Sequence, residues 1–179
     1  MKDKGITLIE LIIVISIIGI LVVALGFEFS GWMGKYKVES EIKEMYVDLM
    51  NARVRAMERN RAHFVTGTLA PPYTYSIYED TNPGPDGNSI CEPANDTLIP
   101  AYPKTLDHAL TWTGGLITID ARGIISPAAN LLGGTLCLTT DSDPDYDCIV
   151  ISRTRINMGK LTTKISDGGA CNSGNCVAR

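Results

Sequence analysis

The sequence predicts an α+β protein in which one long amino-terminal helix packs against an antiparallel β-sheet. Three observations lead to this fold class. The chain of 179 residues opens on a long apolar run, a helical stripe of apolar residues follows it, and short β-type runs separated by turns occupy the remainder. We therefore divide the chain into a short basic leader at residues 1–5, an apolar helix at 6–27, an amphipathic helix at 28–62 and a β-rich head at 63–179.

The apolar helix is long enough to cross a membrane. Residues 11–27 carry no charged side chain, and a helix over residues 6–27 spans roughly 33 Å, about the thickness of a bilayer core. A cleaved secretory signal is the alternative, but its apolar region is shorter and ends at a small-residue cleavage site. Lys2 and Lys4 favour a cytoplasmic amino terminus, which places the bulk of the chain on the outer side.

Glu10 is an anomaly in this segment because an acidic side chain costs about 2.5 to 3.5 kcal/mol at the centre of a bilayer. Near the first turn of a helix the cost is small, since the positive end of the helix and the headgroups lie close by. Position alone therefore leaves two interpretations open for Glu10, a harmless carboxylate at a helix end and a functional one.

The run Gly-Ile-Thr-Leu-Ile-Glu at residues 5–10, with its short basic leader and its long apolar continuation, resembles the class III signal of type IV pilins and type II secretion pseudopilins. The resemblance implies that a prepilin peptidase removes the leader by cutting between Gly5 and Ile6, and methylates the new amine of Ile6. It also implies that Glu10 meets the amino terminus of a neighbouring subunit in a filament, a partner that a buried carboxylate requires.

Two departures from the family pattern are visible. The methylated position, most often Phe in the family, is Ile6 here, and no proline precedes Pro71, so the proline that loosens the helix of many major pilins is missing. The resemblance further implies a pilin-like lollipop anchored once in the bacterial inner membrane, with its amino terminus cytoplasmic and its head periplasmic. Its expected partners are other pilins through helix bundling, the prepilin peptidase and inner-membrane lipid.

The second helical segment carries its apolar residues on one stripe. Spacings of three and four place them on one helix face, which we expect to pack on a sheet. A coiled coil is the rival interpretation, but the stripe spans fewer than three heptads. The basic stretch at residues 53–61 is typical of a solvated helix end, where cations are favoured. The stripe consists of Val38, Ile42, Met45, Leu49, Ala52 and Ala56.

The head shows β-type runs at residues 73–78, 110–113, 116–119, 135–139 and 148–156. Turns rich in Gly, Pro, Asp and Asn separate these runs and predict an antiparallel arrangement. The polar segment at residues 80–103 reads as a long surface excursion.

The runs at residues 117–127 and 148–156 resemble the GspH/FimT group of minor pseudopilins, some members of which bind DNA through a Gly-Arg-x-Arg motif. Ser152, Arg153 and Arg155 occupy the matching positions here, with Lys160 close behind. On a strand, residues i and i+2 face the same side, so both arginines are expected to reach successive phosphates. An ordinary sheet surface is the alternative, and the net charge of -4 favours it.

The five cysteines, Cys91, Cys137, Cys148, Cys171 and Cys176, all follow the apolar segment. Outside the cytoplasm, disulfides are the default interpretation. Cys171 and Cys176 flank a short loop, and Cys137 and Cys148 flank a polar turn that a bridge could staple, which leaves Cys91 over. Four paired cysteines permit three arrangements, and the connectivity stays open.

An alternating acidic run suggests a calcium loop, because calcium prefers clustered oxygen ligands. The run does not match the EF-hand pattern, since Tyr146 and Ser152 stand where that loop needs Gly and Glu. An irregular calcium loop and a plain acidic turn remain, and the plain turn is favoured. The run consists of Asp141, Asp143, Asp145 and Asp147.

The sequence offers no catalytic constellation. Its two histidines, His63 and His108, have no metal-ligand spacing, and no nucleophile elbow or phosphate-binding loop is present. We therefore expect no enzyme activity and no cofactor. The expected function is structural, as a minor subunit of a secretion pseudopilus or a pilus. A membrane-displayed DNA receptor and an anchored binding domain that never polymerises are the alternatives.

Overall fold

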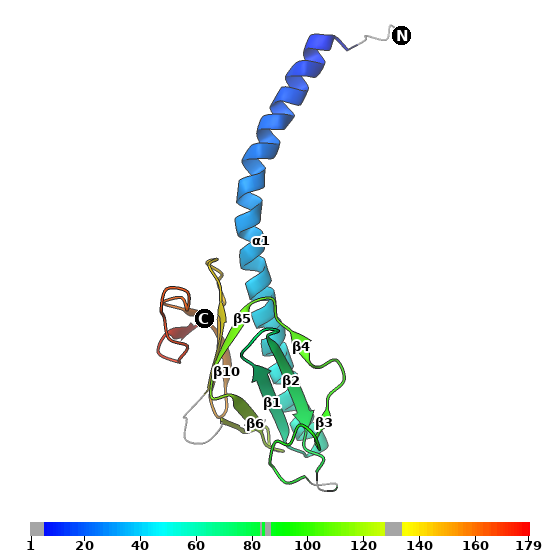
Figure 1. Ribbon diagram of the computed structural model, residues 1–179, viewed down its shortest axis with the longest axis vertical. Coiled ribbons are helices and arrows are strands. Elements are labelled where there is room, and N and C mark those ends of the chain that lie inside the picture. The colour runs from blue at the N-terminus through cyan, green and yellow to red at the C-terminus, as the bar shows by residue number, and fades with distance from the viewer. Residues whose placement is uncertain (1–5, 83, 85–86, 128–133) are drawn as a thin grey trace.

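A computed structural model describes residues 6–82, 84, 87–127 and 134–179. In the described part of the chain, one long helix carries a β-rich head on its carboxy-terminal half (Figure 1). This α+β, pilin-like architecture is the fold class that the sequence predicts. The helix is the first element of the chain and the strands follow it without a further helix among these residues.

The helix α1 runs from Leu8 to Arg59 without interruption, a length of 52 residues or about 78 Å. It ends at Asn60, which adopts a left-handed conformation with φ 52° and whose N–H donates to the carbonyl of Ala56. Asparagine tolerates this conformation better than most residues, so it serves as a helix terminator. The apolar and amphipathic halves predicted from the sequence are thus parts of the one long helix that the fold class requires.

The first sheet packs its strands in the order β3-β2-β1-β6-β7, and β4 also pairs with β2. Every pairing is antiparallel, and β1 holds the centre, with His63 opposite Glu79 of β2 and Ile119 of β6. Its strands are β1 (His63–Thr68), β2 (Thr74–Glu79), β3 (Thr97–Leu98), β4 (Lys104–Thr105), β6 (Leu116–Ile119) and β7 (Ile125–Pro127).

The second sheet has the order β11-β10-β9-β8-β5 and is also antiparallel throughout. The division of the described strands between two sheets is a feature that the strand pattern does not indicate, because periodicity says nothing about which strands pair. Its strands are β5 (Ala109–Thr113), β8 (Gly134–Thr139), β9 (Cys148–Ile151), β10 (Ile156–Leu161) and β11 (Cys176–Ala178).

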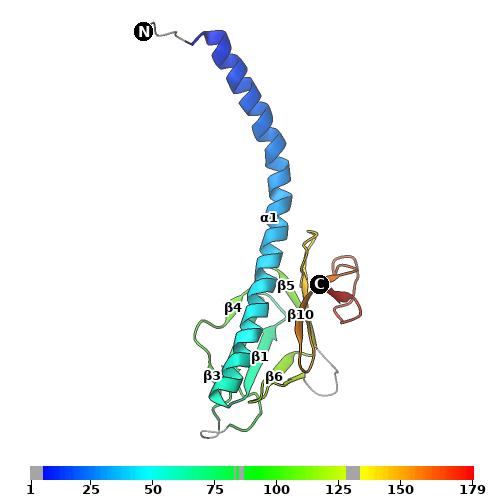
Figure 2. The same ribbon diagram turned by 180° about the vertical axis from the view of Figure 1, so that it is seen from behind.

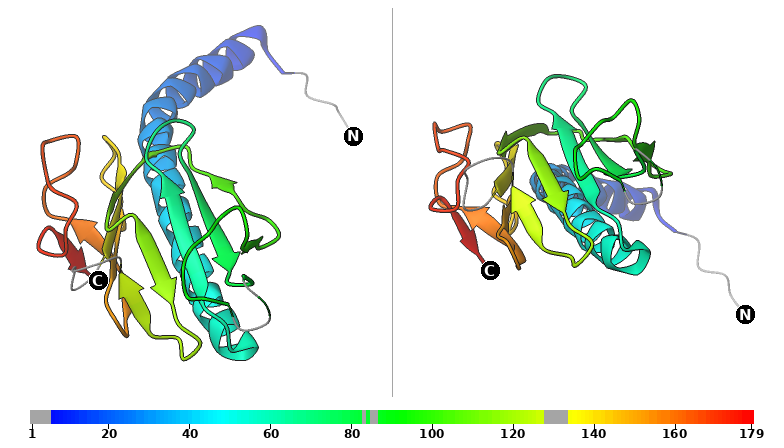
Figure 3. Two further views of the ribbon diagram at one scale, coloured as in Figure 1. Left: turned by 60° about the horizontal axis from the view of Figure 1, so that its bottom comes forward. Right: turned by 90° about the horizontal axis from the view of Figure 1, so that it is seen from below.

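The core lies between α1 and both sheets. All six residues of the predicted apolar stripe are buried, with at most 3% of their surface exposed. They form one cluster with inward-facing residues of both sheets, such as Ile77 and Ile117 of the first and Leu136 and Ile149 of the second. The strands lie in front of α1 in Figure 1 and behind it in Figure 2, so the head covers one side of the helix. Figure 3 shows the same arrangement from the end of the head.

The predicted late strand at residues 148–156 is wrong in its extent. β9 ends at Ile151 and β10 begins at Ile156, and a turn joins them. Ser152 closes this turn, because its N–H donates to the carbonyl of Arg155 over 2.8 Å and its hydroxyl accepts from the N–H of Arg155 over 3.2 Å. Serine side chains compete with strand hydrogen bonds in this way, which an apolar pattern does not report.

Candidate functional site

The amino-terminal end of α1 is closed by a capping box formed by Thr7 and Glu10. The hydroxyl of Thr7 accepts from the N–H of Glu10 over 3.4 Å, and the Glu10 carboxylate accepts from the N–H of Thr7 over 3.3 Å. The Thr7 hydroxyl also donates to the same carboxylate oxygen over 3.1 Å. These bonds satisfy donors that the first helical turn leaves without partners. The Thr-x-x-Glu spacing was visible in the sequence as a capping signature, although the sequence interpretation did not use it.

The Glu10 carboxylate is thus bound to Thr7, the residue that directly follows Ile6. Ile6 precedes the helix and is 78% exposed. Its backbone nitrogen belongs to the residue before Thr7, whose N–H binds the Glu10 carboxylate. An amine created at Ile6 by cleavage would be a cation beside this carboxylate. Gly5, the other residue of the predicted processing site, lies outside the described residues, together with the rest of the leader.

From residue 6 to residue 23, the chain presents its apolar side chains to the surroundings on all sides. Ser16 interrupts them, but its hydroxyl donates to the carbonyl of Ile12 over 2.8 Å and so has a partner within the helix. A contiguous apolar surface of this size marks a site that is buried in a partner or in lipid. The exposed set comprises Ile6, Leu8, Ile9, Leu11, Ile12, Ile13, Val14, Ile15, Ile17, Ile18, Ile20, Leu21, Val22 and Val23.

Among the described residues, no helix combines the length and the apolar character needed to cross a membrane. The single-pass topology and the membrane segment at residues 6–27 stay predictions.

A buried polar network, which sequence reasoning missed, fastens the head to α1. Asp48 is 7% exposed and accepts from the hydroxyl of Tyr75 and from the ammonium of Lys104, both over 2.7 Å. Lys104 also pairs with Glu44 over 2.7 Å and lies 5.5 Å from the ring centre of Tyr102. Burial and the Asp48 carboxylate raise the pKa of Tyr75, so its hydroxyl stays protonated and remains a donor.

Arg153 and Arg155 lie on the β9–β10 turn rather than on a strand, so the expected strand-face geometry for phosphate contacts is not present. Both side chains are exposed. Two other arginines lie near this turn: Arg53 of α1 donates to the carbonyl of Thr154 over 3.0 Å, and the turn that carries Arg122 packs against Arg53, since a Cβ on Gly123 would lie 3.2 Å from its Cγ. Arg53 therefore lies at the turn that carries Arg153 and Arg155, at the end of the head far from residue 6, whereas the side chain of Arg122 pairs with Asp120 over 3.1 Å.

Lys160, the third residue of the expected DNA site, does not join this group. It lies on β10, half-buried, and its ammonium pairs with the Asp143 carboxylate over 2.8 Å. The pairing with Lys160 lowers the pKa of Asp143. Lys160 therefore acts within the head as a partner of the β8–β9 turn.

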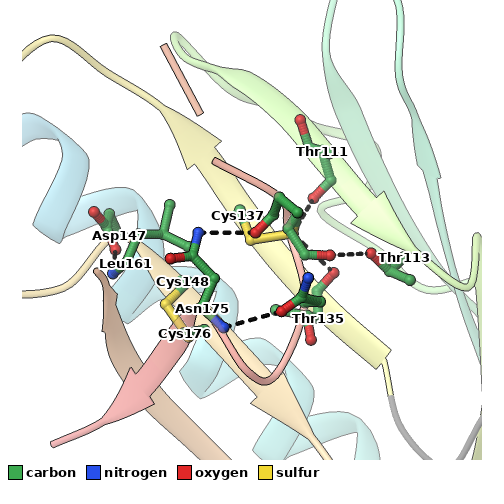
Figure 4. The surroundings of a disulfide bond; sticks show 12 residues. Thr111, Thr113, Thr135, Cys137, Asp147, Cys148, Leu161, Asn175 and Cys176 are labelled. Atoms are coloured by element: carbon green, nitrogen blue, oxygen red, sulfur yellow. Dashed lines mark hydrogen bonds between the residues drawn. A yellow bond between two sulfur atoms is a disulfide. The ribbon is translucent and has the colours of Figure 1, made fainter. Parts of the chain in front are cut away.

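Two disulfides join strands β8 and β9 of the second sheet to the carboxy-terminal tail, residues 162–179, which ends in β11 (Figure 4). Cys137 of β8 pairs with Cys171, and Cys148 of β9 pairs with Cys176 of β11. The four cysteines singled out from the sequence are thus bridged, and the structure decides the connectivity that the sequence left open: Cys137 and Cys148 do not form the bridge considered across the polar turn, and Cys171 and Cys176 do not pair with each other. Cys137 and Cys148 are register partners on adjacent strands, yet each side chain turns to the tail that crosses the sheet.

Further polar contacts hold the tail in place beside the disulfides. The Thr113 hydroxyl donates to the carbonyl of Cys171, and the side-chain amide of Asn175 donates to the carbonyls of Ala170 and Thr163 over 2.9 and 2.7 Å. Cys91 is the free cysteine of the described chain and is half-buried. Burial raises the pKa of its thiol, and the nearby Asp96 and Asp80 add to this effect, so the thiol stays protonated.

The acidic turn between β8 and β9 does not gather its carboxylates at one point. The Asp145 N–H donates to Glu39 of α1 over 3.0 Å, and Asp147 is buried, where it accepts from the N–H of Leu161 over 2.7 Å. Among the described residues, no three acidic, histidine or cysteine side chains converge to hold a metal ion. The carboxylates of Asp141, Asp143, Asp145 and Asp147 thus do not converge among the described residues, and the calcium loop considered from the sequence stays a prediction.

Comparison with known proteins identifies a family motif at the amino-terminal end of the chain. Residues 1–26 match the family model described as the prokaryotic N-terminal methylation motif. No curated protein and no solved structure matches the chain. The matched segment contains Ile6, Thr7 and Glu10, and it supports a type IV pilin-like protein with a class III signal. The motif implies, in general, a membrane-anchored subunit that a prepilin peptidase processes and that assembles with other pilins.

Proposed function

We propose that this chain is a structural minor subunit, a pseudopilin or minor pilin, of a type II secretion pseudopilus or a type IV pilus. In this role it is cut before Ile6, held in the inner membrane by residues 6–27 until assembly, and then bundled with other subunits through α1. The observation that carries the proposal is the methylation-motif match at residues 1–26, which coincides with the exposed apolar half of α1.

The distribution of burial along α1 supports this role. The head covers the stripe from Val38 to Ala56, whereas the apolar side chains from Ile6 to Val23 are at least 48% exposed. Burial of apolar surface is worth about 25 cal/mol per Å², so these residues favour lipid or a neighbouring helix strongly over water. The two halves of one helix are thus suited to two partners, the chain's own head and an external apolar environment.

The capping box gives Glu10 a role before assembly. In the single chain its carboxylate accepts from the N–H of Thr7, which offsets the cost of holding a charge in an apolar segment. In the filament we propose that the carboxylate binds the amine of Ile6 of a neighbouring subunit, because a buried carboxylate needs an opposite charge or several donors.

Replacement of the residue before the cleavage point tests the processing step. Gly5→Leu in the full chain, expressed with a prepilin peptidase, is expected to leave the protein at its precursor mass. Gly19→Leu is the matched control, since nothing lies within 4 Å of a Cβ at Gly19, and it should be processed normally. Mass spectrometry of the amino-terminal peptide reports both cleavage and methylation. Full conversion of the Gly5→Leu chain to a product that begins at Ile6 would refute this assignment.

A DNA-binding role is a second candidate, favoured by the gathering of Arg153 and Arg155 with Arg53 at the end of the head. Neither Arg153 nor Arg155 forms an ion pair with a described residue, in contrast to Arg122, which pairs with Asp120 over 3.1 Å. Exposed arginines of this kind bind phosphates and release counterions, so affinity falls steeply with salt.

Mobility shifts of the full chain in neutral nanodiscs test this candidate. Arg153→Gln with Arg155→Gln should weaken DNA binding and flatten its salt dependence. Lys35→Gln with Lys37→Gln, an equal change of charge on the helix before the head, should leave binding unchanged. Absence of any shift at low salt would remove the DNA-binding candidate and leave the structural role intact.

A further inference from the structure

The exposed apolar half of α1 is followed by a pair of aromatic rings. Trp32 and Tyr36 stack with their ring centres 5.9 Å apart and their planes at 25°. Both side chains are open to the surroundings, 60% and 57% exposed. Trp and Tyr carry an apolar body with a polar tip, and for this reason they are enriched where a membrane meets water.

This pair points away from the head. Successive residues of a helix are rotated by about 100°, which places Trp32 and Tyr36 on the side of α1 opposite Gly34. Gly34 marks the side where the head approaches, because a Cβ there would lie 2.6 Å from the hydroxyl oxygen of Ser142. The same rotation puts Lys35 beside the aromatic pair on one side and Lys37 on the other side, between the pair and the Gly34 face, and both lysines are exposed.

The distance along the helix places the pair at one boundary of a bilayer. Ile6 and Trp32 are 26 residues apart by their numbers, or about 39 Å along a helix. A bilayer has a hydrocarbon core of about 30 Å and measures about 40 to 45 Å with its headgroups. With Ile6 and the Glu10 capping box near one headgroup layer, Trp32 and Tyr36 reach the opposite layer.

We propose that Trp32 and Tyr36, flanked by Lys35 and Lys37, bind the outer headgroup layer of a membrane that contains anionic phospholipid. We call these four residues the aromatic collar. The collar sets the depth of α1 in the bilayer before the subunit is assembled. The inference rests on the proposed membrane anchoring of residues 6–27, and it adds the residues that mark the outer boundary of the membrane segment.

Charge complementarity supports lipid as the occupant of the collar. Lysines close to a membrane surface are attracted to anionic headgroups. Two nearby carboxylates have a cationic partner other than the collar: Glu39 of α1 pairs with Lys43 over 3.0 Å, and Asp143 of the β8–β9 turn pairs with Lys160 over 2.8 Å. Lys35 is close enough to both carboxylates to contribute, after these partners, to lowering their pKa. The collar therefore presents a basic, aromatic surface although the whole chain is acidic.

Tryptophan fluorescence measures the depth of the collar directly. The chain has two tryptophans, and the other one, Trp112, is 6% exposed in the core. In the Trp112→Phe chain, reconstituted in phosphatidylcholine and phosphatidylglycerol vesicles, lipids brominated near the headgroup should quench Trp32 about twofold more than lipids brominated deep in the acyl chains. If Trp112→Phe does not fold, the difference between the unaltered chain and its Trp32→Phe variant isolates the same signal.

A second probe separates the collar from the anchor. With both natural tryptophans replaced by Phe, Ile15→Trp reports the middle of the apolar segment and should be quenched most by the deep bromines. Suppose that the tryptophan at position 15 is quenched by the deep bromines. If Trp32 is then not quenched at all, or is also quenched mainly by the deep bromines, the collar is overturned and the anchor stands. Absence of quenching at position 15 would overturn the proposed anchoring itself. Protection of Trp32 only after mixing with other filament subunits would reassign the pair to a protein contact.

The role of the lysines is tested by lipid charge. Addition of phosphatidylglycerol should strengthen headgroup-level quenching of Trp32, and Lys35→Gln with Lys37→Gln should abolish this dependence. Arg153→Gln with Arg155→Gln, which removes the same charge at the far end of the head, should retain it. Equal dependence on phosphatidylglycerol in both double variants would refute recognition of anionic headgroups by the collar.

Discussion

The hydroxyl of Tyr75 donates a 2.7 Å hydrogen bond to the carboxylate of Asp48 inside the core. This bond joins β2 to α1, and Lys104 balances the charge of the same carboxylate over 2.7 Å. A buried carboxylate with two donors is stable only while both remain. The contact therefore fastens the head to the helix that carries the amino-terminal site.

Loss of the Tyr75 hydroxyl is expected to destabilise the head. Tyr75→Phe removes one donor from a buried carboxylate, and hydrogen bonds to charged groups are worth about 1.5 to 3 kcal/mol. Urea unfolding of the full chain in detergent should show a loss in the free energy of unfolding within that range. Tyr36→Phe, which removes the hydroxyl of an exposed tyrosine, should leave it unchanged. A similar free energy of unfolding in both variants would contradict the importance of the Asp48 contact.

The disulfide pairing is testable by peptide mapping without reduction. We expect one crosslinked peptide pair with Cys137 and Cys171 and another with Cys148 and Cys176. Replacement of either pair by Ser should lower the free energy of unfolding by about 2 to 4 kcal/mol. Cys91→Ser is the control and should cost much less, because its thiol is free. A recovered crosslink between Cys137 and Cys148 would refute the pairing.

His63 is expected to make the head less stable in mild acid. Its ring is fully buried, and Nε2 has no hydrogen-bond partner among the described residues. Burial lowers the pKa of His63 below its ordinary value of 6.5. The unfolded chain therefore binds a proton before the folded one does, so stability is complete above pH 6.5 and falls as the pH decreases toward the lowered pKa.

Replacement of His63 by Phe should flatten this dependence. The free energy of unfolding, measured from pH 7.5 down to pH 5, should decline in the unaltered chain and decline less in the His63→Phe variant. The ring-proton NMR signal of His63 provides a direct control, since its titration midpoint should lie below 6.5. Identical slopes in the two chains would show that His63 does not determine the acid sensitivity.

Variants of Thr7 and Glu10 distinguish the role of the Glu10 carboxylate in the helix cap from its proposed role in assembly. Glu10→Gln keeps an acceptor for the Thr7 N–H but removes the charge, whereas Thr7→Ala removes the hydroxyl of the cap and keeps the charge. Thr7→Ala should reduce helix stability by about 1 kcal/mol and still permit crosslinking of subunits in cells. Glu10→Gln should preserve helix content by circular dichroism and abolish the crosslinks. Normal crosslinking in Glu10→Gln chains would show that the carboxylate serves only the cap.

The sequence by itself determined the elements that depend on local periodicity. The stripe from Val38 to Ala56 predicts the buried face of α1 because residues three and four apart share a side of a helix. The strand at residues 116–119 also has the predicted bounds. Its side chains alternate between buried and half-buried, and this alternation depends only on the order of neighbouring residues along the strand. The motif at residues 5–10 likewise lies within one short segment, and it names the candidate processing site.

Only the tertiary structure decided how distant segments meet. Cys137 and Cys171 are separated by 34 residues, and no pattern in the chain states that the tail crosses the second sheet. The Asp48 network likewise joins residues from α1, β2 and β4. The arginines of the β9–β10 turn lie beside Arg53 because a serine ends the strand early. These contacts result from long-range packing, whose geometry depends on all the elements together, whereas periodicity reports each element alone.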